Sequence, residues 1–95
     1  MGTGHESLFR ALADTQRRTI LRVLRGGEHA AGELADALGL APATLSHHLS
    51  LLRTAGLVRV RRDGRQRIYA LNTSVMEDAM VWMAELLKPP SEGKQ

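Results

Sequence analysis

The stretch GELADALGLAPATLSHHLSLLRTAGLV, residues 32–58, contains two short helical patterns separated by a turn. Leucine and alanine side chains share one side of the first helix, which Gly39 can end in the left-handed conformation. Pro42 suits the first position of the second helix because its φ is already close to the helical value. The second helix repeats a stripe at i, i+3, i+4 and i+7, formed by Leu45, His48, Leu49 and Leu52.

The opposite side of the second helix carries only small or hydrogen-bonding side chains. A helix pair joined by a short glycine-containing turn, with such a face on its second helix, is typical of a helix-turn-helix, whose second helix lies in the DNA major groove. Helix hairpins also occur in ordinary bundles, so this stretch alone leaves DNA binding and simple packing both open. The face comprises Ala43, Ser46, His47, Ser50 and Thr54.

The length of 95 residues predicts one domain, and the absence of cysteine excludes disulfides and thiolate metal sites. No apolar run reaches the roughly 18 to 20 residues that a membrane span needs, and the start of the chain lacks the pattern of an export signal. We therefore expect a cytoplasmic protein without membrane insertion. Residues 1–88 are predicted to form the domain, and residues 89–95 a flexible tail after the first of two prolines.

The positive charge is concentrated in one segment. Residues 1–52 have a net charge of zero, residues 53–67 carry six arginines and one aspartate for a net charge of +5, and residues 68–95 have a net charge of −2. A basic block directly after a candidate DNA-reading helix favours phosphate contact, although an isolated charge run is more often a solvated face.

Two helices are expected before the central stretch. Residues 6–13 form a short amphipathic segment, and Asp14 is a suitable N-cap for a helix over residues 15–25. A further helix begins near residue 30 or 31 without a capping side chain. The arginines of the second helix could touch the DNA backbone, but a solvated helical face is the favoured interpretation for Arg17, Arg18 and Arg22.

After the central stretch, the pattern changes to the alternation of a β-hairpin. A two-residue Asp-Gly loop would put Val60 opposite Arg67. We favour a three-residue loop over residues 63–65, which puts Val60 opposite Ile68 and lets apolar residues share one face. The residues expected on the buried face are Val58, Val60, Ile68 and Ala70. The residues expected to project outward are Arg61, Arg65 and Arg67.

The last helix is expected over residues 75–87, opened by a capping box of Ser74 and Glu77 and ended by Pro89. Its apolar residues cover more than one narrow stripe. This surface could be the core of a monomer, but a two-fold interface is the favoured interpretation. The residues in question are Met76, Met80, Trp82 and Met83.

The predicted fold is mainly α with a small β-hairpin: four helices, two strands and a fifth helix, which is a winged helix-turn-helix. The segments LFRALADTQRRTIL, residues 32–58 and RRDGRQRIYAL, with the closing helix, resemble the ArsR-type bacterial repressors, especially their SdpR-like autorepressor branch. The resemblance implies a homodimer built mainly from the first and last helices. It also implies a transcriptional repressor that binds double-stranded DNA, inserting its fourth helix into the major groove of a palindromic operator.

The resemblance also implies site residues. Its recognition pattern covers Ala41 and His48 as well, but His48 lies in the apolar stripe and is predicted to be structural. The expected DNA-reading residues are Pro42, Ala43, Thr44, Ser46 and His47. The expected wing and backbone contacts are Arg61, Arg62, Arg65 and Arg67. The expected dimer interface comprises Leu8, Phe9, Leu12, Met76, Met80, Trp82, Met83 and Leu87.

Many ArsR-type proteins sense metals, and their ligands are missing here. The third helix has no cysteine, and the last helix has Glu77, Asp78 and Glu85 but no histidine. We therefore expect no metal and no cofactor, and the effector remains unassigned. No nucleophile is paired with a base, so an enzyme is not expected. The alternatives are a repressor responding to a metal or small molecule at an unrecognised site, and a winged helix that binds proteins.

Overall fold

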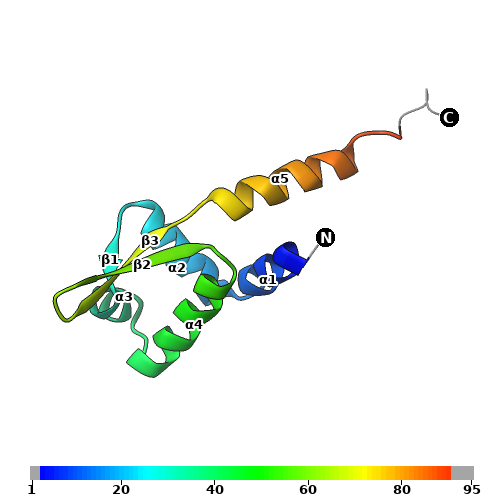
Figure 1. Ribbon diagram of the computed structural model, residues 1–95. Helices are drawn as coiled ribbons and strands as arrows, with labels where there is room; N and C mark the ends of the chain where they lie inside the picture. Colours follow the sequence, from blue (N-terminus) through cyan, green and yellow to red (C-terminus); the bar gives the residue numbers. More distant parts are fainter. Residues whose placement is uncertain (1–2, 91–95) are drawn as a thin grey trace.

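The computed structural model describes residues 3–90, and its helices follow the predicted order (Figure 1). The first helix differs slightly, beginning and ending before the predicted residues. The elements are α1 (Thr3–Leu12), α2 (Thr15–Arg25), β1 (His29–Ala30), α3 (Ala31–Leu38), α4 (Pro42–Thr54), β2 (Val58–Asp63), β3 (Gln66–Leu71) and α5 (Ser74–Leu87). No helix within residues 3–90 has both the length and the apolar content to cross a membrane.

The core lies where the first four helices meet the sheet. Each of these helices contributes at least one leucine or isoleucine that is almost completely buried, and no polar side chain of the described residues is buried with them. The largest fully buried side chains are Leu8, Ile20, Leu34, Leu52 and Leu57. Leu8, expected at the dimer interface, is only 1% exposed, so it belongs to the core of the protomer.

The turn that presents α4 has the predicted chemistry. Gly39 ends α3 with φ 65°, and the backbone N–H of Leu40 donates to the Ala35 carbonyl at 3.0 Å. Pro42 then occupies the first turn of α4. The three leucines of the predicted stripe, Leu45, Leu49 and Leu52, are buried. The opposite face of α4 is therefore turned to solvent.

The sheet has a third strand that the sequence did not predict. β1 pairs antiparallel with β3, giving the order β1-β3-β2. A strand of two residues is too short to show alternation, so no sequence pattern indicated it. The strand ties the segment between α2 and α3 to the middle of β3.

The predicted hairpin register is wrong by one residue. Val60 lies opposite Tyr69, and Asp63 lies opposite Gln66, leaving a two-residue loop of Gly64 and Arg65. Gly64 takes φ 65° at the first loop position, where two-residue hairpin loops favour glycine. The large ring of Tyr69 is only 6% exposed, so its burial outweighs that of the smaller Ile68.

This register separates the wing arginines between two faces. Residues directly opposite each other share a face, so Arg62 and Arg67 extend the core-facing side beyond the core, and Arg61 lies on the other side with Ile68. The expected burial of Ile68 and Ala70 is therefore wrong, since both are only partly covered on the far face. The core-facing apolar residues are Val58, Val60, Tyr69 and Leu71.

The predicted capping box of α5 is also wrong, because Ser74 is the first helical residue and not the cap. Asn72 makes the side-chain hydrogen bonds at this end instead. Its Oδ1 accepts from the Ser74 N–H at 3.3 Å, and its Nδ2 donates to the Gly56 carbonyl at 3.1 Å. These bonds anchor the start of α5 to the end of α4. The helix ends at Leu87, and the tail expected over residues 89–95 lies largely outside the described residues.

The loop geometry predicts opposite effects at two glycines. Gly64→Ala should destabilise the domain by about 1 to 2 kcal/mol, because an L side chain must adopt a left-handed φ there. Gly32→Ala, in the first turn of α3 with open space around it, should stabilise by roughly 0.5 to 1 kcal/mol. Urea unfolding of both variants measures the difference. A Gly64→Ala variant as stable as the parent would contradict the assigned turn.

Candidate nucleic-acid interface

The exposed face of α4 carries the predicted DNA-reading residues. Since the leucine stripe is buried, the polar side chains of the first two turns point away from the protein. His48 departs from this face, because its side chain is only 12% exposed. The residues of the family's reading pattern that are exposed are Ala41, Pro42, Ala43, Thr44, Ser46 and His47.

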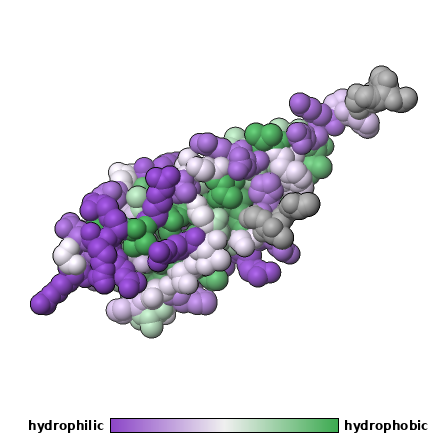
Figure 2. Space-filling model, viewed as in Figure 1, coloured by the Kyte–Doolittle hydropathy of each residue, from purple (hydrophilic) through white to green (hydrophobic). Residues whose placement is uncertain are grey.

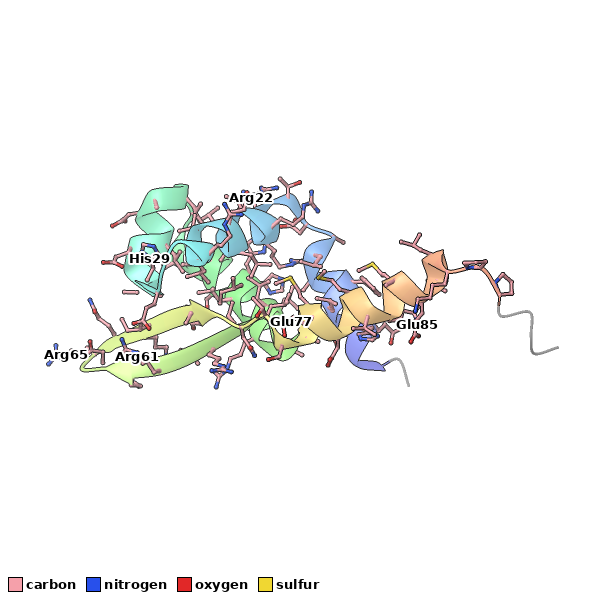
Figure 3. All side chains as sticks on the ribbon, turned by 90° about the horizontal axis from the view of Figure 1, so that it is seen from above. Arg22, His29, Arg61, Arg65, Glu77 and Glu85 are labelled. Atoms are coloured by element: carbon pink, nitrogen blue, oxygen red, sulfur yellow. The ribbon has the colours of Figure 1, made fainter. Side chains whose placement is uncertain are left out.

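The wing extends beyond the core at the end opposite α5. Arg65 lies at its tip (Figure 3), and Arg62 and Arg67 are also exposed. Arg67 and Ser46 line one pocket of about 160 Å³ between α3, α4 and β3. The wing and the exposed start of α4 therefore border the same surface, and Figure 2 shows hydrophilic residues gathered at this end.

Arg61, one of the four expected wing contacts, is paired within the protein. Arg61 donates to Glu28 in an ion pair, and this bond and the charge of Glu28 raise the pKa of the guanidinium above its ordinary value. Arg61 also lies on the face away from Arg62 and Arg67. Arg61 and Arg67 were expected on the same face of the hairpin, but they lie on opposite faces. Arg61 is therefore the weaker candidate for phosphate contact.

Behind the reading face, a polar cluster joins α1, α2 and α4. Asp14 caps α2 by accepting from the Arg17 N–H at 3.2 Å, and its Oδ2 lies 3.8 Å from Nδ1 of His48. Partial desolvation opposes ionisation of Asp14, but the bond and charge of Arg17 and the nearby His48 prevail and lower its pKa. The sequence predicted the Asp14 cap but not its contact with His48, because His48 lies far away in the chain.

The second-helix arginines are not simply solvated. Arg17 and Arg18 both donate to backbone carbonyls at the end of α1, with Arg18 Nη1 at 2.7 Å from the Leu12 oxygen. Arg22 is exposed, as expected. Within residues 3–90, no group of three or more histidine, aspartate or glutamate side chains is arranged to hold a metal ion.

Comparison with known proteins assigns this architecture. Residues 14–60 match the model of the bacterial regulatory proteins of the arsR family. The transcriptional repressor SdpR of Bacillus subtilis is 36% identical over 81 residues, which cover 85% of this chain and 90% of SdpR. The chain belongs to the ArsR family. CmtR of Mycobacterium tuberculosis is 47% identical over 77% of this chain, and the match spans 62% of the length of CmtR.

Solved structures of ArsR regulators agree with this assignment. The crystal structure of one ArsR family transcriptional regulator matches with a TM-score of 0.85 and 29% identity. The match covers 92% of this chain and 90% of the regulator's chain. The homodimeric winged helix-turn-helix DNA-binding domain of Mb0332 from Mycobacterium bovis has a TM-score of 0.73 and 32% identity, covering 86% and 78%. The chain is therefore a DNA-binding transcriptional regulator and not an enzyme.

The position of His47 predicts a role in base choice. His47→Ala should change the preference at one base position by about 1 to 3 kcal/mol, because the ring can hydrogen-bond a base edge in the major groove. Ser50→Ala, one turn further along the same face, is the matched control and should change little. Competition binding with single-base variants measures both. Equal weakening of His47→Ala on every sequence would contradict a reading role.

Proposed function

We propose that the chain is a homodimeric repressor that acts in the cytoplasm and binds a palindromic operator without a resident metal. Residues 1–88 would then form one unit for both dimerisation and DNA binding. The observation that carries the proposal is the large apolar surface exposed on α5, at the end of the molecule away from the wing (Figures 1 and 2).

Most of this exposed surface lies on one arc of α5. At 100° per residue, Met76, Met80, Met83 and Leu87 fall within one side, whereas the acidic residues fall on the other. Contiguous exposed apolar surface of this kind marks an interaction site. The exposed fractions on α5 include Met80 at 64%, Trp82 at 43%, Met83 at 41%, Leu86 at 66% and Leu87 at 85%.

The first helix contributes to the same surface. The ring of Phe9, which is 39% exposed, lies 5.9 Å from the ring of Trp82, and His5 also lies 5.9 Å from Trp82. Leu12 and Met76 are half-buried at its border. A two-fold contact between α1 and α5 of two copies would cover this cluster, and the homodimeric relative from M. bovis supports such an arrangement.

Dimerisation would place two α4 helices on one DNA face. In helix-turn-helix dimers the half-sites lie about one helical turn, ~34 to 36 Å, apart, so operator symmetry mirrors protein symmetry. The exposed arginines of each wing would contact phosphates and supply affinity, whereas α4 would choose the sequence.

The test is selection of duplexes from a random library by the purified protein, followed by gel shifts on the enriched sequences. We expect enrichment of a palindrome, unchanged binding after chelation by EDTA, and no release on adding Zn²⁺ or Ni²⁺. Release by either ion would favour the metal-responsive alternative. Failure to enrich any palindrome over random duplex would overturn the proposal.

A further inference from the structure

The guanidinium of Arg17 lies where α1, α2 and α4 meet. Its Nε donates to the Ala11 carbonyl at 2.8 Å, and its Nη2 donates to the Arg10 carbonyl at 3.1 Å. Both carbonyls are in the last turn of α1, where helix carbonyls have no partner within the helix. A cation at this end is also favoured by the helix dipole. Arg17 therefore holds the C-terminal end of α1.

The remaining nitrogen of the same group reaches the reading helix. Nη1 of Arg17 lies 3.3 Å from Nδ1 of His48. A guanidinium can only donate, so Nδ1 of His48 is the acceptor in this hydrogen bond. His48 is largely covered, and the next residue towards the start of α4 is the exposed His47. One side chain thus connects the end of α1 to the back of the DNA-reading face.

We propose that Arg17 is a positioning residue that fixes the angle between α1 and α4, and thereby the separation of the two reading helices. The proposal rests on the dimer proposed above, in which α1 contributes Phe9 to the interface. The apolar contacts between α1 and α4 are non-directional, whereas hydrogen bonds from a planar guanidinium specify an orientation. A small rotation at this junction moves both α4 helices relative to the two-fold axis.

Arg18 provides a matched comparison within the same turn of α2. Its Nη1 donates to the Leu12 carbonyl at 2.7 Å and its Nη2 to the Thr15 hydroxyl at 3.3 Å. Arg18 therefore holds the same end of α1 but makes no hydrogen bond to α4 within the described residues. Any effect that depends on the link to α4 should separate Arg17 from Arg18.

The test measures the distance between the two α4 helices in the free dimer. The chain has no cysteine, so Ser50→Cys, on the exposed face of α4, attaches one nitroxide per protomer. Double electron–electron resonance should give a narrow distance distribution in the parent and in Arg18→Met. In Arg17→Met and His48→Leu the distribution should be about twofold broader or more, because the directional bonds to α4 are gone.

Two disrupting variants are used in case one of them misfolds. His48→Leu keeps both bonds from Arg17 to α1, and a leucine suits the apolar stripe of α4. Far-UV circular dichroism checks that each variant is folded. Parent-like distributions in Arg17→Met and His48→Leu would overturn the proposal, and so would equal broadening in Arg18→Met. A parent that shows no dipolar coupling would instead refute the dimer itself, and the positioning role with it.

Discussion

Met83→Glu is expected to convert the protein to a monomer and to weaken operator binding by at least about a hundredfold. Met83 lies on the apolar arc of α5 and is 41% exposed in the protomer. In a two-fold dimer each copy would bring one new carboxylate to the same interface. Like charges placed together in an interface cost several kcal/mol, and each 1.4 kcal/mol is a tenfold change in affinity.

Val81→Glu is the matched control for this variant. Val81 is 61% exposed on the same helix, but at 100° per residue it falls on the arc that carries Glu77, Asp78 and Glu85. We expect Val81→Glu to remain dimeric and to bind normally. Sedimentation velocity gives the mass of each variant, and gel shifts give its affinity. A dimeric Met83→Glu variant would show that the apolar arc of α5 is not the interface.

The helical part of the fold was predictable because local chemistry and periodicity agree there. Gly39, Pro42 and the leucines of α4 lie where the sequence predicts, and Asp14 caps α2 as expected. Helix boundaries depend on residues close together in the chain, so one sequence carries enough information to place them.

The hairpin could not be predicted as well, because its register depends on burial by distant elements. Shifting the pairing by one residue keeps the alternating pattern but exchanges which residues are covered. Packing of Tyr69 and Leu71 against the helices decides between the registers. The same shift explains why Arg61 lies away from Arg67, so this part of the candidate site changed with it.

The polar links were also beyond prediction. Arg17 contacts His48 across 31 positions, and Glu28 contacts Arg61 across 33. Arg17, Glu28 and Arg61 resemble ordinary surface charges in the sequence, and His48 was predicted to be structural without a named partner. Only the fold brings the partners together. The exposed reading face of α4, by contrast, follows from its leucine stripe, because a helix with one buried side must turn the other to solvent.

The triple variant Arg62→Ala, Arg65→Ala, Arg67→Ala is expected to lose most of the affinity for every duplex, operator and random sequence alike. The three side chains are exposed around the tip and core-facing side of the wing, and a dimer would present six of them. Each phosphate neutralised contributes about 0.9 to the slope of log K against log salt. The slope should therefore become shallower by about five, and binding at low salt should weaken by at least about a hundredfold.

Arg61→Ala separates phosphate contact from the loss of positive charge in general. It removes the same kind of side chain from the same hairpin, but from the face where Arg61 pairs with Glu28. Its slope should therefore change by less than about one. Fluorescence anisotropy with a labelled duplex over a range of KCl concentrations measures both variants. An unchanged slope in the triple variant, or an equal loss in Arg61→Ala, would place the DNA on a different surface, because charge that meets phosphate must appear in the salt dependence.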